Sequence, residues 1–161
     1  MSAAPDTADI KGDAMNLWPI GNCEIAALID SKASIRWGCL PRFDGDPVFC
    51  SLLEPEKDHG FWDVLLEGCT RIEQHYVRNT PVLVTRMSAD CGNVIEIVDF
   101  MPRYQRHDRM FRPVAIARII RVISGSPRIA VRLRPAHSWG AQTPAHTSGS
   151  NHIRYILDDH T

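Results

Sequence analysis

Short apolar runs separated by turn-forming residues restrict the fold of this chain more than any other feature. From Leu17 onward, runs rich in Val and Ile alternate with clusters of Gly, Pro, Asn, Asp and Ser. Strands joined by turns have this pattern, and no stretch keeps the period of a long amphipathic helix. The sequence therefore predicts an all-β fold, a mainly antiparallel β-sandwich.

The apolar runs define the predicted strands, and the turn residues between them define the predicted hairpins. Turn residues at 30–33, 90–93 and 124–127 predict three hairpins, which makes the pairing mainly antiparallel. The strands predicted from the apolar runs are 24–29, 34–39, 61–66, 70–77, 81–89, 94–99, 114–123, 128–134 and 152–157.

Two of these strands carry an informative pattern of side chains. In 128–134, Ile129, Val131 and Leu133 alternate with arginines, which predicts one buried face and one wet face. In 114–123 nearly every residue is apolar, which predicts a strand in the middle of a sheet with both faces covered.

Three segments lack the rhythm of strands. Residues 1–14 are small, polar and acidic, which predicts a flexible N-terminal segment before a folded domain at 15–161. Residues 101–113 form a basic loop, and residues 135–151 form a polar one. Loops of this length are often functional.

Composition narrows the partners and the compartment. The chain has 161 residues, 44% of them hydrophobic, which suits one globular domain. Its net charge of -1 gives no overall field for nucleic acid or an anionic membrane, so neither is expected as a partner. The five cysteines show no Cys-x-x-Cys pair, and no secretory signal or membrane span is evident. These features predict a cytoplasmic protein with reduced thiols.

The usual local motifs of catalysis and cofactor binding are missing. The sequence contains no Gly-x-Ser-x-Gly, no His-Glu-x-x-His and no glycine-rich phosphate loop, so neither a metal nor another cofactor is expected. The basic loop carries Tyr104 and Phe111 together with an arginine series that could suggest RNA contact. At neutral net charge, a solvated loop whose charges pair with acidic neighbours is the simpler interpretation. The series is Arg103, Arg106, Arg109 and Arg112.

One loop concentrates the residue types that hold sugars. Aromatic rings pack under the apolar faces of sugars, and planar charged groups bond their hydroxyls. Trp37, Arg42, Phe43, Asp44 and Asp46 supply both types. The competing interpretation places Trp37 in the core, because it alternates with Ile35, and pairs Arg42 with Asp44 to pin the loop.

At this loop the sequence resembles the start of bacterial glycoside hydrolase family 15 proteins, the glucoamylase-like and trehalase-like enzymes. Several collinear motifs between about residues 16 and 140 carry the resemblance. They are Gly21-Asn22, Ala26-Ala27-Leu28-Ile29, Ser34-Ile35-Arg36-Trp37, Leu40-Pro41-Arg42-Phe43-Asp44, Val48-Phe49, Gly60-Phe61-Trp62, Val98-Asp99-Phe100-Met101-Pro102 and Leu133-Arg134-Pro135.

The resemblance implies an N-terminal β-sandwich that precedes a separate (α/α)6-barrel catalytic domain, and that barrel is absent from this chain. The family's two catalytic carboxyls belong to the barrel, so no catalytic residue is assigned here. No glutamate of this chain stands in a matching motif. The glutamates concerned are Glu24, Glu54, Glu56, Glu67, Glu73 and Glu96. The family's sandwich continues past this point, which predicts open sheet edges that favour pairing with another copy.

Three functional hypotheses follow. The first is a non-catalytic N-terminal domain of an α-glucoside hydrolase, whose loop with Trp37, Arg42, Phe43 and Asp44 faces the catalytic barrel and borders the α-glucoside substrate. The second is a stand-alone glucan-binding module with Trp62 or Trp139 as a stacking platform. The third is an assembly domain that forms a homodimer through an open sheet edge.

Overall fold

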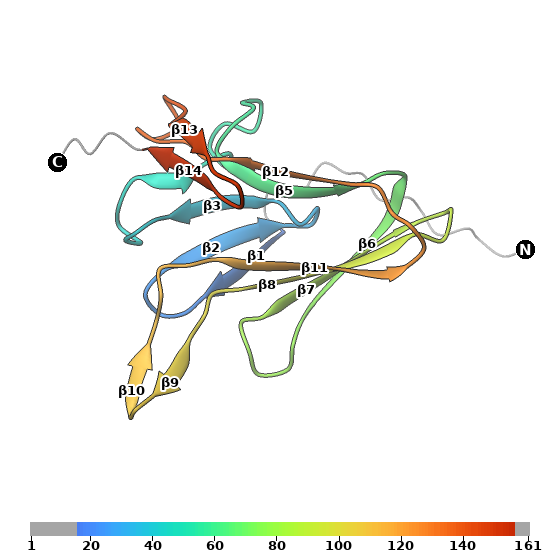
Figure 1. The fold of residues 1–161 in the computed structure, drawn as a ribbon, viewed down its shortest axis with the longest axis horizontal. Coiled ribbons are helices and arrows are strands. Elements are labelled where there is room, and N and C mark those ends of the chain that lie inside the picture. Colours follow the sequence, from blue (N-terminus) through green and yellow to red (C-terminus); the bar gives the residue numbers. More distant parts are fainter. Residues whose placement is uncertain (1–15, 157–161) are drawn as a thin grey trace, which may run out of the picture.

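The computed structural model describes residues 16–156, and every regular element in that range is a β-strand. Most of the strands form two antiparallel sheets, which lie against each other as the layers of a sandwich (Figure 1). The all-β, mainly antiparallel fold predicted from the sequence is confirmed. The predicted flexible segment 1–14 lies outside the described residues.

The first sheet has the strand order β1-β2-β3-β5-β12, and β4 pairs with β3. Its strands are β1 (Leu17–Gly21), β2 (Ala26–Asp30), β3 (Ile35–Cys39), β4 (Pro47–Phe49), β5 (Phe61–Leu66) and β12 (Ile129–Arg134).

The second sheet has the strand order β11-β8-β7-β6. Its strands are β6 (Cys69–Tyr76), β7 (Leu83–Ala89), β8 (Val94–Phe100) and β11 (Ala117–Ser124). Two separate hairpins complete the described fold, and they consist of β9 (Tyr104–Arg106) with β10 (Arg109–Phe111) and β13 (Ala145–Ser148) with β14 (Ile153–Ile156).

The core lies between the two sheets and follows the alternation of side chains along each strand. Ile29 of the first sheet and Leu83 of the second are both fully buried in one cluster. Val64 of the first sheet and Ile95 of the second are fully buried in the other. Because alternate residues of a strand point to opposite faces, one row of apolar side chains per strand suffices to build this core.

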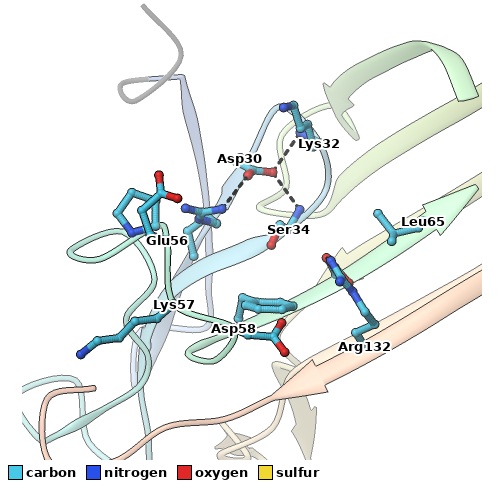
Figure 2. A pocket seen from close by; sticks show the side chains of 12 residues that line it. Asp30, Lys32, Ser34, Glu56, Lys57, Asp58, Leu65 and Arg132 are labelled. Carbon is cyan, nitrogen blue, oxygen red and sulfur yellow. Dashed lines mark hydrogen bonds and ion pairs between the residues drawn. The ribbon is translucent and has the colours of Figure 1, made fainter. Parts of the chain in front are cut away.

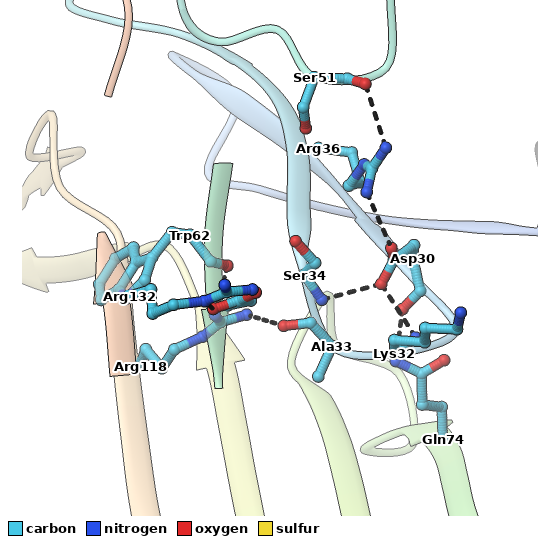
Figure 3. A network of polar contacts seen from close by, with 11 residues as sticks. Asp30, Lys32, Ala33, Ser34, Arg36, Ser51, Trp62, Gln74, Arg118 and Arg132 are labelled. Carbon is cyan, nitrogen blue, oxygen red and sulfur yellow. Dashed lines mark hydrogen bonds and ion pairs between the residues drawn. The ribbon is translucent and has the colours of Figure 1, made fainter. Parts of the chain in front are cut away.

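A buried ion pair connects the two sheets. Arg118 on β11 donates to both carboxylate oxygens of Asp99 on β8, with Nε–Oδ1 at 2.7 Å and Nη2–Oδ2 at 3.1 Å. The same guanidinium reaches the first sheet, where it donates to the carbonyl oxygens of Trp62 and Ala33 at 2.8 and 2.9 Å (Figure 3). Burial raises the pKa of Asp99, and its hydrogen bonds from Arg118 oppose that rise.

Each predicted strand has an observed counterpart with small shifts at its ends, and two predicted hairpins are confirmed. Asp30 closes the turn between β2 and β3 because its side chain accepts hydrogen bonds from the backbone N–H groups of Lys32 and Ser34. Gly92, with φ of +85°, lies in the turn between β7 and β8.

The predicted hairpin at 124–127 is wrong. The strand before it, β11, pairs with β8, whereas the strand after it, β12, pairs with β5 in the other sheet. The connection therefore crosses between the layers. Asn93 holds the crossing, because its side-chain oxygen accepts a hydrogen bond from the backbone N–H of Ser126 at 3.0 Å.

The predicted central position of the strand at 114–123 is also wrong. This strand, β11, is an edge of its sheet, and Ile119, Val122 and Ile123 are 40%, 57% and 47% exposed. The two sheets of this chain therefore leave several apolar side chains of β11 exposed.

The prediction for 128–134 holds only in part. Leu133 packs against the core, but Ile129 and Val131 on the same face are half-exposed, because β12 ends its sheet. On the opposite face, Arg132 forms an ion pair with the buried Asp63.

The two predicted loops contain regular structure. Residues 101–113 form the β9–β10 hairpin, and residues 135–151 contain β13 and an isolated bridge between His137 and Gln142. The short strands β1 and β4 were not predicted. Both include a proline, which weakens the pattern of a strand.

Candidate functional site

The loop from Leu40 to Asp46, between β3 and β4, is closed by an ion pair. Arg42 donates twice to Asp44, with Nε–Oδ1 at 3.0 Å and Nη2–Oδ2 at 2.8 Å. The hydrogen bond from Arg42 lowers the pKa of Asp44. The predicted pair therefore forms, and between its members Phe43 stands 74% exposed.

Asp46 connects this loop to a second one. Its carboxylate accepts hydrogen bonds from the backbone N–H groups of Ser138 and Trp139, two consecutive residues with φ of +53° and +56°. Carboxylates commonly fix such left-handed turns by accepting several N–H bonds. The turn presents Trp139, which is 62% exposed.

Trp37 and Trp139 lie together beside this loop. Their ring centroids are 6.5 Å apart at an interplanar angle of 48°. Trp37 is half-buried rather than a core residue, so the interpretation that places it in the core is wrong. We call the surface formed by Trp37, Arg42, Phe43, Asp44 and Trp139 the aromatic loop face.

Sequence reasoning missed the contact between Asp46 and the turn at 138–139. The partners are 92 and 93 positions apart, and no local pattern joins them. The available signals were an aspartate next to Pro47 and a Ser-Trp-Gly triplet typical of a turn.

A polar pocket of about 380 Å³ lies over β3, β5 and β12 (Figure 2). Its lining includes both acidic and basic side chains, and Asp30 lies on one side of the pocket while Arg132 lies on the other. Arg132 also lies 5.1 Å above the ring of Phe61, so this arginine covers the aromatic face that a sugar would stack on.

Most of the polar groups in this pocket already have partners (Figure 3). Asp30 accepts backbone hydrogen bonds and lies 3.8 Å from Arg36, whose guanidinium also donates to the carbonyl oxygen of Ser51. The carboxylate of Asp63 accepts two hydrogen bonds from Arg132. The pocket is therefore mainly a network that pins the outer face of the first sheet.

The carboxyls with shifted pKa values do not form an accessible acid–base pair. Asp44 has a lowered pKa and is exposed, whereas Asp99 has a raised pKa and is fully buried under Arg118. A general acid needs a raised pKa together with contact to substrate. Neither aspartate combines the two properties.

Trp62, one of the two predicted stacking platforms, is not available for a sugar. Its ring packs against the core, and the guanidinium of Arg118 lies 5.2 Å from its centroid. Trp139 remains exposed on the aromatic loop face.

Residues 16–156 show neither a cluster of metal ligands nor a membrane-spanning helix. His, Cys, Asp and Glu side chains there do not gather in threes as metal ligands would. That range also lacks any helix with the length and apolarity to cross a membrane.

Comparison with known proteins gives one family match. Residues 13–154 match the family described as "Trehalase-like, N-terminal". The search of solved structures gave no significant match.

The curated relatives are named as trehalases. The chain is 30% identical over 127 residues to "Trehalase" of Thermoplasma volcanium, which covers 78% of this chain and 20% of that protein. It is 28% identical over 120 residues to "Trehalase" of Thermoplasma acidophilum, covering 73% and 20%. It is 27% identical over 116 residues to "Trehalase 2" of Sulfolobus acidocaldarius, covering 72% and 18%. The chain thus matches about a fifth of the length of these relatives.

Proposed function

Because this chain belongs to the family of trehalase-like N-terminal domains, we propose that it is the non-catalytic N-terminal domain of an inverting α-glucoside hydrolase. The parent protein is proposed to be of the glucoamylase or trehalase type in glycoside hydrolase family 15. It acts in carbohydrate metabolism in the cytoplasm. The domain packs on a catalytic (α/α)6 barrel and shapes its cleft.

The observation that carries this proposal is the open side of the sandwich. Val122 on β11 and Val131 on β12 are 57% and 50% exposed, although Ile120 and Leu133 on the same strands pack into the core. Exposed apolar side chains on edge strands of both sheets favour an interaction surface. The relatives are about five times longer than the matched region, so we assign this surface to the part of the parent protein outside the matched region.

The aromatic loop face is the proposed border of the substrate cleft. Phe43 is 74% exposed on a loop that the Arg42–Asp44 pair closes. An aromatic ring beside an arginine can contact the apolar face and the hydroxyls of a glucoside.

Glucose release tests the proposal directly. The purified chain and the full-length parent protein are each incubated with trehalose, maltose and isomaltose. We expect the full-length protein alone to release glucose. Release by the short chain would overturn the non-catalytic assignment, and no release by the full-length protein would overturn the hydrolase assignment.

A second candidate function is glucan binding by the isolated domain, which the contact between Trp37 and Trp139 favours. Stacking of a glucose oligomer on the exposed Trp139 would protect its fluorescence from acrylamide. If maltooligosaccharides do not change the quenching of tryptophan fluorescence by acrylamide, this function is excluded.

A third candidate is a homodimer, which the exposed edge strand β11 favours. Edge strands readily pair with another copy. Light scattering of the purified chain distinguishes a dimer from a monomer. A monomer at all concentrations would exclude the assembly role.

A further inference from the structure

We propose that the β9–β10 hairpin is a preformed docking arm for an acidic protein surface with an apolar centre. The arm comprises residues 102–113 and stands clear of the two sheets (Figure 1). The inference rests on the proposed function in one respect, because we place the acidic surface on the catalytic part of the same full-length protein.

The root of the arm is fixed to the body by a buried amide. Asn22 is 1% exposed, and its Nδ2 donates to the carbonyl oxygens of Pro102 and Pro113 at 3.0 and 2.9 Å. These two prolines are the two ends of the arm. The Oδ1 of Asn22 accepts from the backbone N–H groups of Glu24 and Ile25, so the amide itself cannot rotate freely. The arm therefore leaves the body in a defined direction.

The strands of the arm expose apolar side chains near its root rather than at the turn that forms its tip. Tyr104 and Phe111 are cross-strand partners whose rings stack at 5.6 Å with an interplanar angle of 14°. They are 48% and 40% exposed, and Met110, which points to the opposite face of the hairpin, is 46% exposed. Beside the root lies a cavity of about 490 Å³, lined partly by Val82 and Phe100. An exposed aromatic cluster next to a hollow is typical of a protein interface.

The arm also carries an excess of positive charge, with Asp108 as its one acidic residue against the arginines. Arg106, Arg109 and Arg112 are exposed, and no ion pair involves them within the described range of the chain. The expected pairs between these arginines and acidic neighbours are therefore not found among residues 16–156. Arg106 and Arg109 even face each other in the register of the hairpin. Like charges directly opposite destabilise a strand pair, and an acidic partner relieves that repulsion.

The contacts favour a protein over a glucan as the partner. The rings of Tyr104 and Phe111 use one face each on one another, which leaves less ring area for a sugar. Unpaired guanidinium groups match carboxylates better than they match neutral hydroxyls. Nucleic acid also accepts contacts from arginine and aromatic side chains, and the experiment below distinguishes it from a protein partner.

A photo-crosslinking experiment on the full-length protein tests the inference. A photoreactive phenylalanine replaces Met110, and the crosslinked peptides are mapped after irradiation. We expect crosslinks within the same molecule to an acidic segment outside this chain's sequence. The yield should fall roughly fivefold or more in Arg106→Glu, and it should also fall in about 0.5 M salt, because both weaken charge pairing.

Arg106→Glu separates docking from folding of the arm. The new glutamate faces Arg109 and forms a favourable cross-strand pair, so the hairpin itself becomes more stable while its net positive charge falls. Arg154→Glu is the matched control, because Arg154 is an exposed arginine on the other hairpin. Its crosslink yield should equal that of the unmodified protein.

Four results would overturn the inference: no crosslink from position 110, equal yields in Arg106→Glu and the control, crosslinks to a second copy, or crosslinks to co-purified nucleic acid. Glucose release is measured on the same preparations. Glucose release without a crosslink would contradict only the docking role of the arm. A crosslink without glucose release would support the docking role and contradict the proposed hydrolase function.

Discussion

Replacing Arg118 by methionine should lower the stability of this chain by about 3–5 kcal/mol at neutral pH, the usual cost of breaking a buried ion pair. The side chains of Arg118 and Asp99 are 1% and 0% exposed. The guanidinium donates two hydrogen bonds to Asp99 and one each to the carbonyl oxygens of Trp62 and Ala33. Methionine fills the space but leaves a buried charge and two carbonyl groups without these donors.

Urea unfolding followed by far-ultraviolet circular dichroism measures this loss. With a slope of about 2 kcal/mol per molar urea, the midpoint should fall by roughly 1.5–2.5 M. Because folded domains have only about 5–15 kcal/mol of stability, the variant could be largely unfolded. Arg118→Lys is a milder companion, since it keeps the charge and loses the planar fork.

The double variant Arg118→Met with Asp99→Leu tests the cause. Removing both partners leaves no buried charge, so its loss should be smaller than the sum of the two single losses by more than about 1 kcal/mol. Additive losses, or a loss below about 1 kcal/mol in Arg118→Met, would refute the reasoning that this pair ties the sheets together.

The stability difference should also depend on pH. Burial raises the folded-state pKa of Asp99, and Arg118 opposes the rise, so the pKa rises further in Arg118→Met. A carboxyl whose pKa is raised in the folded state destabilises the fold at high pH, where it must carry its buried charge. Below its unfolded pKa of about 3.9 it is protonated in both states, and this loss of stability disappears. The difference in free energy of unfolding between the unmodified chain and Arg118→Met should therefore become smaller as the pH falls from about 7 to about 4.

Further changes test the other sites. Arg42→Ala should leave the melting temperature of the full-length protein nearly unchanged and reduce glucose release, because its side chain is 76% exposed; equal losses of both would contradict the cleft assignment. Asp46→Ala should change the fluorescence of Trp139, because two backbone hydrogen bonds to the turn are lost; an unchanged spectrum would show that the turn holds itself. Asn22→Asp should cost roughly 1–3 kcal/mol in urea unfolding through its lost donors, and wild-type stability would contradict the account of the arm root.

The fold class and most strand positions could be predicted because they depend on local patterns. The turn at Asp30 and the strand at 61–66 are examples, since the side-chain alternation and the turn residues are adjacent in the sequence. The crossing after Ser124 could not be predicted. Gly125 and Ser126 suit a hairpin turn equally well, and the choice of sheet depends on β8 and β5, which lie far away in the sequence.

The candidate site was predictable only where its contacts are local. Arg42 and Asp44 are two positions apart, and their pair follows from the sequence alone. The position of Trp139 depends on Asp46, and the direction of the arm depends on Asn22, and both contacts join segments more than 75 positions apart. Residue types indicated that these side chains were unusual, but only the fold brings them to their partners.

The error on β11 is itself informative about the proposed packing. Its apolar sequence is that of a strand covered on both faces, yet Val122 is 57% exposed and Ile123 is 47% exposed at the edge of the sheet. A strand that is apolar on both faces is usually covered on both faces, and the described part of this chain does not cover β11. If the parent protein covers β11, replacing Val122 by lysine should destabilise the full-length protein and leave the isolated chain nearly unchanged. Equal melting temperatures of the full-length protein with and without the lysine would place this surface in solvent and remove the main support for the proposed packing.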